Sequence, residues 1–277
     1  MVIGADRLRA ELTAFLETHG IPDAAFDVRC MMEQVTGKRL EILLSHGIES
    51  EDENSIRNML QRRACGEPLQ YILGEWEFYG MRMYVGKGVL IPRPDTETLV
   101  DAVLERCRDK VSLRMLDICT GSGCIALALK AHLPGAEVHG MDVSADALAY
   151  ARKNAVCHRL EVVWHQADAL QPYPDMGQFD VIVSNPPYLT DAEMQTLQTE
   201  IQHEPGIALA GGRDGLHFYR ELTRYWKGAV CPDGLLAYEI GETQADAVQS
   251  VMQDAGFRNI RILQDEANHD RVVLGEK

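Results

Sequence analysis

The sequence predicts an α/β protein in which a doubly wound parallel sheet follows a small N-terminal helical bundle. Two observations carry this prediction. The first 65 or so residues show helical patterns only, whereas strand-like and helix-like segments alternate after Arg114. With 46% hydrophobic and 25% charged residues among 277, the chain also has the composition of globular domains with a sizeable core.

Composition and charge exclude several classes of protein. No run of eighteen apolar residues and no apolar leader occurs, so we expect a cytoplasmic protein with no membrane partner. The seven cysteines form no CxxC pair and the nine histidines no HExxH pattern, so we expect neither a disulfide framework nor a metal site. The net charge is −15, whereas proteins that bind duplex nucleic acid need basic faces. We therefore expect no direct nucleic-acid substrate.

The N-terminal part predicts a small helical bundle without strands. Apolar residues at helical spacing begin at Leu8, and Gly20 with Pro22 ends that helix. A second helix is expected between Asp23 and Gly37, and a third over 55–65. Such a bundle either packs against the main domain or docks a partner.

Between the two regions the sequence becomes aromatic and glycine-rich. The alternation of apolar residues from Phe78 to Val85 predicts a hairpin. Pro92 and Pro94 then stiffen a loop, and Asp95 or Thr96 is expected to cap the following helix. We therefore divide the chain into a helical domain over 1–75, a hairpin linker over 76–92 and a larger α/β domain over 93–277.

The larger domain carries seven candidate strands. They are Met115–Ile118, Glu137–Met141, Glu161–His165, Phe179–Ser184, Leu235–Ile240, and a closing pair near Ile260–Leu263 and Val272–Leu274. Helical segments lie between the first five, which is the rhythm of parallel βαβ units.

The first of these strands leads into a glycine-rich turn, LDICTGSGCIALAL, which begins at Leu116. Gly121 and Gly123 let the backbone turn tightly and approach a ligand closely. Asp142 ends the next strand, where dinucleotide-binding folds place an acid that binds ribose hydroxyls. The third glycine of GxGxxG and a Walker lysine are both missing, which favours a nucleoside without a pyrophosphate. Asp117 would then organise the turn and face the cationic end of a ligand such as S-adenosylmethionine.

A third acid, Asp168, follows the third candidate strand. Two interpretations of this residue remain open. It either contacts an adenine amino group, as acids at this place often do in such folds, or caps a helix.

The fourth strand ends in VIVSNPPYLT, at the sheet edge where open α/β folds bind ligands. Pro186 and Pro187 lack backbone N–H donors, so the carbonyls of Asn185 and Pro186 remain available as acceptors in a rigid turn. The Asn185 side chain adds an amide oxygen, and Tyr188 adds an aromatic wall. Acceptors beside a flat wall suit a planar NH₂ group that attacks a methyl carbon, a reaction governed by positioning and electrostatics rather than by a charged base.

These motifs resemble the class I methyltransferases that act on amide or exocyclic nitrogen. Four further segments narrow the resemblance to the HemK/PrmC family of N5-glutamine methyltransferases, and it covers nearly the whole chain. They are GEPLQYILG from Gly66, FYG from Phe78, GVLIPRPDTE from Gly88 and EPGIALAGGRDGLHFY from Glu204. The resemblance implies a Rossmann-like seven-stranded catalytic domain and a helical domain that docks the substrate.

The resemblance also implies an activity. It is methylation by S-adenosylmethionine of the glutamine side chain in the Gly-Gly-Gln motif of class 1 peptide chain release factors. Asn185, Pro186 and Tyr188 would be catalytic, and with Pro187 they would bind the substrate. The cofactor site would comprise Asp117, Cys119, Thr120, Gly121, Ser122, Gly123, Asp142, Asp168, Ala169 and Asn185.

Two residues depart from the family pattern. Cys119 stands where many relatives have glycine, and Ala169 stands where some carry a large aromatic residue.

Three other functions remain as alternatives. They are methylation of a glutamine in a ribosomal protein, N6 methylation of adenine in a nucleic acid, and a non-enzymatic scaffold that docks on the translation apparatus. For Glu239 two interpretations remain open, a position at the border of the site and a structural role. No role is assigned to Arg93.

Overall fold

The computed structural model describes residues 2–171 and 176–277, which form two compact units. One unit comprises Met1–Glu75 together with Gln198–His203, and the other comprises Trp76–Leu197 together with Glu204–Lys277. The predicted hairpin linker over 76–92 thus lies wholly within the second unit and is not a separate domain. Within the ranges described, no helix is both long and apolar enough to cross a membrane.

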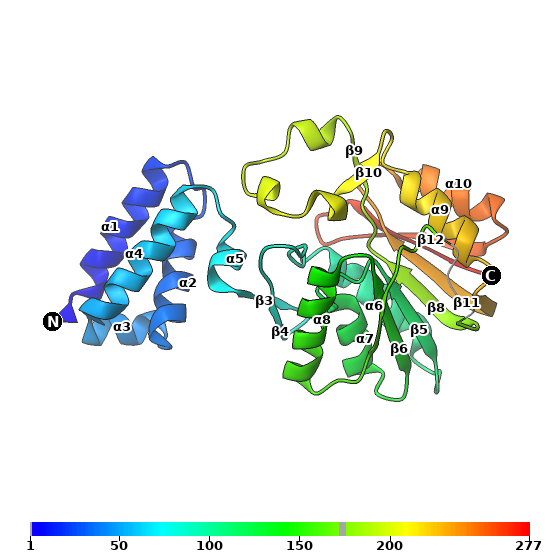
Figure 1. The fold of residues 1–277 in the computed structure, drawn as a ribbon, viewed down its shortest axis with the longest axis horizontal. Coiled ribbons are helices and arrows are strands. Elements are labelled where there is room, and N and C mark those ends of the chain that lie inside the picture. The colour runs from blue at the N-terminus through cyan, green and yellow to red at the C-terminus, as the bar shows by residue number, and fades with distance from the viewer. Residues whose placement is uncertain (1, 172–175) are drawn as a thin grey trace. The chain divides into compact units, whose positions relative to one another are not determined.

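The first unit is a bundle of helices around a core of leucine, methionine and valine side chains (Figure 1). Its helices are α1 (Ala5–Thr18), α2 (Ala24–Thr36), α3 (Leu40–His46), α4 (Ser50–Ala64) and α5 (Leu69–Leu73). Helix α2 ends at Gly37, whose φ of 65° is left-handed. Helix α4 begins five residues earlier than the sequence predicts, because Glu51, Asp52 and Glu53 favour its N-terminal turn.

The prediction that this bundle contains no strand is wrong. Two-residue strands, β1 (Val2–Ile3) and β2 (Ile48–Glu49), pair in antiparallel fashion. Strands this short have no room for alternation, so only the tertiary packing specifies them.

The segment Gln198–His203, which includes the short 3₁₀ helix η2 (Ile201–His203), is held within this first unit. The Arg63 guanidinium is buried and donates to Asp27 Oδ2 at 2.6 Å and to Glu200 Oε1 at 2.6 Å. At Gly66, whose φ is +87°, a Cβ atom would lie 2.6 Å from Thr199 Cγ2. The close fit explains why glycine stands at this position.

The second unit is built on a seven-stranded sheet in the order β12-β13-β11-β8-β5-β6-β7. Its strands are β5 (Arg114–Ile118), β6 (Glu137–Asp142), β7 (Val163–Gln166), β8 (Phe179–Ser184), β11 (Val230–Glu239), β12 (Arg258–Gln264) and β13 (Asp270–Glu276). Strand β13 runs antiparallel to both neighbours, and the remaining pairs are parallel. The class of fold that the sequence predicts is therefore confirmed.

Helices cover both faces of this sheet (Figure 1). One face packs against α6 (Thr96–Cys107), α7 (Cys124–His132) and α8 (Ala145–His158), and the other against α9 (His217–Trp226) and α10 (Ala245–Asp254). Alternate strand residues enter opposite cores: Met115 faces α6 and α7, whereas Leu116 faces α9 and α10. Two hydrophobic cores therefore hold the sheet rigidly on both sides.

Several local predictions need correction. Strand β7 begins at Val163 rather than Glu161, and β11 begins at Val230, before an irregularity in register that ends at Leu235. Asp95 precedes helix α6 without a side-chain capping bond and lies instead 3.3 Å from Arg271. The structure also adds a parallel pair, β9 (Leu189–Thr190) with β10 (Ala210–Gly212), and the 3₁₀ helices η1 (Glu193–Gln195) and η3 (Gly206–Ala208).

The predicted hairpin forms as β3 (Glu75–Phe78) and β4 (Met81–Tyr84). Asn154 of α8 accepts from the Tyr84 backbone N–H at 2.7 Å and donates to the Tyr84 carbonyl at 3.1 Å. The same amide donates to the Ser122 carbonyl at 3.0 Å. Asn154 therefore ties the hairpin directly to the glycine-rich turn.

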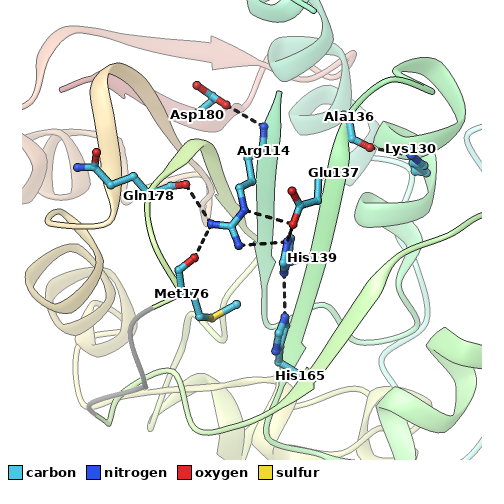
Figure 2. Close-up of polar contacts among 9 residues, drawn as sticks. All are labelled: Arg114, Lys130, Ala136, Glu137, His139, His165, Met176, Gln178 and Asp180. Carbon is cyan, nitrogen blue, oxygen red and sulfur yellow. Dashed lines mark hydrogen bonds and ion pairs between the residues drawn. The ribbon is translucent and has the colours of Figure 1, made fainter. Parts of the chain in front are cut away.

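A polar cluster links residues near the starts of β5, β6 and β8 to His165 in β7 (Figure 2). His139 Nδ1 lies 2.9 Å from His165 Nε2, and His139 Nε2 lies 2.7 Å from Glu137 Oε1. Arg114 joins Glu137 to the carbonyls of Met176 and Gln178. The two histidines therefore have structural partners and lie outside the predicted site.

Candidate active site

In the glycine-rich turn between β5 and α7, every second residue adopts a left-handed conformation, with φ of 60° at Cys119, 56° at Gly121 and 80° at Gly123. A Cβ atom at Gly123 would lie 2.8 Å from Trp164 and 3.1 Å from the Ala151 Cβ, so this glycine is required by packing beneath the turn. At Gly121 the nearest atom to such a Cβ would be 4.0 Å away. Gly121 therefore borders open space, and its backbone is accessible to a ligand.

Asp117 lies behind the turn rather than in front of it. The residue is 1% exposed, and its Oδ2 atom accepts from Thr120 Oγ1 at 2.6 Å and from the Ala126 N–H at 3.2 Å. Its Oδ1 atom has no partner among the described residues. Burial raises the pKa of Asp117 to about 7, against the lowering effect of these hydrogen bonds. The carboxyl group thus organises the turn from beneath.

Asp142, at the end of β6, holds the front of the same turn. Its Oδ2 accepts from the Gly121 N–H at 2.8 Å and its Oδ1 from the Ser144 N–H at 2.9 Å. Burial raises the pKa of Asp142 above its ordinary value, and the backbone hydrogen bonds lower it. Each oxygen can accept a further hydrogen bond, so the carboxylate can still bind two hydroxyl groups.

The third acid, Asp168, is exposed, and its Oδ1 accepts from the Leu170 N–H at 2.9 Å. This bond closes a short turn, and no helix follows within the described residues up to 171. The helix-cap interpretation is therefore wrong. The next residue, Ala169, is buried, and Trp226 Nε1 donates to its carbonyl at 3.0 Å.

The NPPY segment follows β8 and is enclosed by backbone. A Cβ atom at Gly211 would lie 2.6 Å from Tyr188 Cα, and one at Gly215 would lie 2.4 Å from the Tyr188 carbonyl oxygen. Gln244 Nε2 donates to that same oxygen at 3.0 Å. These contacts fix the turn rigidly, while the Pro186 carbonyl accepts no hydrogen bond from the described part of the chain. It remains available as an acceptor.

A single cavity of about 300 Å³ joins the three segments. Of the residues that the sequence assigns to a site, those lining it are Cys119, Thr120, Gly121, Ser122, Asp142, Asp168, Ala169, Asn185 and Pro187. Asp117, Gly123, Pro186 and Tyr188 do not line it. Burial raises the pKa of the Tyr188 phenol to about 12, so this side chain stays neutral at physiological pH.

The structure also brings in residues that sequence reasoning left unassigned. Glu204 is buried, accepts from the Ile91 N–H at 2.9 Å and pairs with Arg93, which lines the cavity. Thr96 lines it as well and accepts from Asn185 Nδ2 at 3.2 Å. Within residues 2–171 and 176–277, no group of three or more His, Cys, Asp or Glu side chains is arranged to hold a metal ion.

Cys119 allows a direct test of strain in the turn. Replacing it with glycine removes the left-handed penalty of a side chain, whereas replacing it with alanine keeps that penalty and loses the same sulfur. We expect the Cys119→Gly protein to be more stable than the Cys119→Ala protein by about 1 kcal/mol, measured by urea unfolding. A glycine variant less stable than the alanine variant would show that the turn is unstrained.

Comparison with known proteins shows which families this chain matches. Residues 94–212 match the model of the methyltransferase small domain, and residues 7–74 match that of the PrmC N-terminal domain. The release factor glutamine methyltransferase of Thermodesulfovibrio yellowstonii is 42% identical over 83% of this chain and 84% of its own. That of Caulobacter vibrioides is 40% identical over 95% of this chain and 92% of its own.

Solved structures show the same fold at low identity. A methyltransferase from Pyrococcus furiosus is 18% identical, with a TM-score of 0.55 over 72% of this chain and 90% of its own. The T. thermophilus 16S rRNA methyltransferase RsmC, in complex with AdoMet and guanosine, is 17% identical, with a TM-score of 0.52 over 73% of this chain and 49% of its own. The fold and the matched methyltransferase domain together define a class I methyltransferase. Within that class, the chain belongs to the family of release factor glutamine methyltransferases.

Proposed function

We propose that this chain transfers a methyl group from S-adenosylmethionine to the side-chain amide nitrogen of the glutamine in the Gly-Gly-Gln motif of class 1 peptide chain release factors. The observation that carries this proposal is that Asn185 and Asp142 open into one cavity. Asn185 begins a rigid turn with free acceptors, and Asp142 is a carboxylate with capacity for two hydroxyls. The relatives, which are release factor glutamine methyltransferases, support this substrate class.

The residues present fit S-adenosylmethionine. Asp142 would accept from the ribose hydroxyls, Asp168 lies at the cavity rim for the adenine amino group, and Val143 and Ala169 line an apolar slot. A small residue at 169 leaves this slot more open than a large aromatic would. When bound, the cofactor supplies an electrophilic methyl group on a sulfonium.

The NPPY turn would prepare the substrate nitrogen. Asn185 Oδ1 and the Pro186 carbonyl would accept from the two N–H bonds of the glutamine amide and hold its nitrogen in place. An amide lone pair is delocalised, so these acceptors act most strongly as the nitrogen leaves planarity. The bond from nitrogen to methyl forms as the sulfur–methyl bond breaks, giving N5-methylglutamine, S-adenosylhomocysteine and a proton that is released to solvent. Pro187 and Tyr188 shape the turn.

Two other acceptors present a comparable NH₂ group, a glutamine of a ribosomal protein and the N6 of adenine. The net charge of −15 disfavours a nucleic acid. The deciding experiment incubates this protein with S-adenosylmethionine and a class 1 release factor, a ribosomal-protein mixture or adenine-containing RNA. Mass spectrometry should find a gain of one methyl group on the Gly-Gly-Gln peptide. A release factor in which that glutamine is replaced should stay unmodified, and methylation of another acceptor alone would refute the proposal.

We further propose that the helical unit docks the release factor. The match of residues 7–74 to the PrmC N-terminal domain supports this division of labour. Deleting residues 1–75 should leave cofactor affinity nearly unchanged, because every residue lining the cavity lies beyond that segment.

The same deletion should slow methylation of the intact factor more than that of a short Gly-Gly-Gln peptide. Calorimetry and initial rates measure the two effects. A soluble truncated protein that methylates the intact factor at the full-length rate would contradict the docking role.

A further inference from the structure

Glu239 is a buried carboxylate to which the scheme above gives no role. It ends β11, is 1% exposed, and its Oε2 atom has no hydrogen-bond partner among the residues described. The neighbouring cation, Arg271, is already paired with Asp265 at 3.0 Å and with Asp95 at 3.3 Å. A buried carboxylate without a cation of its own is costly, and such groups concentrate at functional sites.

Glu239 lies beside the catalytic asparagine, because β11 and β8 pair with Tyr238 opposite Ser184 and the next residues are Glu239 and Asn185. Asn185 Nδ2 donates to Thr96 Oγ1 at 3.2 Å. Burial raises the pKa of Glu239 to about 7, while hydrogen bonding with the Thr96 and Asn185 side chains lowers it. Thr96, Asn185 and Glu239 therefore form one polar group, in which Thr96 and Asn185 line the cavity and Glu239 lies behind them.

The donors and acceptors of these side chains determine which group donates in each hydrogen bond. An ionised carboxylate only accepts, and a threonine hydroxyl has one proton to donate. When Thr96 donates that proton to Glu239, its oxygen must accept from the Asn185 NH₂ group. The Asn185 carboxamide is then oriented with its oxygen free to face the cavity, which the proposed function requires.

Resting on that function, we propose that Glu239 is a positioning residue that fixes the orientation of the Asn185 carboxamide through the Thr96 hydroxyl. A carboxamide turned by 180° would present its NH₂ group to the NH₂ group of the substrate. Two donors would then face each other, and the acceptor that favours the attacking nitrogen would be lost. Glu239 does not line the cavity, so it acts without touching the substrate.

The proposal implies a dependence on pH. A protonated Glu239 can donate to Thr96 and reverse the chain of hydrogen bonds, so the methylation rate should fall as pH decreases through the pKa of this carboxyl. Charged and titratable groups from all surrounding elements face it. They are Arg271, Asp95, Tyr188, Tyr219 and Cys124. Burial raises the pKa of both tyrosines and of the thiol, so these three remain neutral near pH 7.

Single-turnover methylation of a Gly-Gly-Gln release factor tests the expected effect of Thr96 and Glu239 on the rate of methyl transfer. Thr96→Val removes the hydroxyl with little change in shape and should lower the rate about tenfold, whereas Thr96→Ser should keep it. Glu239→Gln should remove the acidic limb of the pH profile. In the Thr96→Val background the Glu239→Gln change should have a clearly smaller effect on the rate, because the route through Thr96 is already broken and only the direct interaction with Asn185 remains. Equal effects of Glu239→Gln in both backgrounds would overturn the proposal.

Thermal unfolding without cofactor or substrate gives an independent test. Asn185→Asp places a second carboxylate against Thr96, so it should lower the melting temperature at pH 8 clearly in the wild-type background. In the Glu239→Gln background the decrease should be much smaller, and equal decreases would overturn the proposal. The unfolding measurement needs no methyl transfer. A wild-type protein that fails to methylate the release factor would therefore count against the proposed function and not against the positioning role of Glu239.

Discussion

Asn185→Ala is expected to slow single-turnover methylation of a release factor by about a hundredfold to a thousandfold, the usual cost of losing one preorganised acceptor at a reacting centre. Asn185 directly follows β8 and lines the cavity, as does Pro187. Its interaction with the substrate strengthens as the amide nitrogen leaves planarity, so the loss should appear in the rate of transfer rather than in substrate affinity.

Two controls make this result specific. S-adenosylmethionine affinity, measured by calorimetry, should change little in Asn185→Ala, because the carboxylate of Asp142 and the glycine turn are untouched. Gln253→Ala removes a comparable carboxamide from an exposed position on α10 and should retain the wild-type rate. If Asn185→Ala retained near-normal turnover, Asn185 would have no part in the mechanism.

The sequence predicted those parts of the fold in which local pattern and tertiary environment agree. Strands β5 and β8 have apolar, buried centres, at residues 115–116 and 181–183, because a central parallel strand is buried on both faces. The pairs β1–β2 and β9–β10 were not predicted, since strands of two or three residues are specified by contacts with distant segments. The same holds for the early start of β11, which precedes an irregularity in register.

The site divides in the same way. The glycine turn and NPPY could be located because close backbone approach and missing donors need particular residue types at adjacent positions. Arg93 and Glu204 could not be paired, because 111 positions separate them along the chain. Glu239 stayed undecided because its role depends on Thr96, which precedes it by more than a hundred residues. The placement of Asp117 behind the turn likewise depends on three-dimensional packing.

The second large effect is expected at Asp142. Asp142→Ala should weaken S-adenosylmethionine binding tenfold or more, because hydrogen bonds to a charged acceptor contribute roughly 1.5–3 kcal/mol each. It should also loosen the turn, since the Gly121 and Ser144 N–H groups lose their acceptor. Asp142→Asn keeps one oxygen and should bind more weakly than the wild type but more tightly than the alanine variant. Asp254→Ala, at an exposed position, should bind normally.

The pH dependence of binding separates the ribose role from a purely structural one. Burial raises the folded-state pKa of Asp142, so lowering the pH protonates this carboxyl before an ordinary aspartate, and the protonated form loses acceptor capacity. Cofactor affinity of the wild type should therefore fall as pH decreases through that raised pKa, while Asp142→Asn should be less sensitive over the same range. Calorimetric titrations at several pH values measure both slopes. Parallel slopes for the two proteins, or unchanged affinity in Asp142→Ala, would remove Asp142 from the cofactor site.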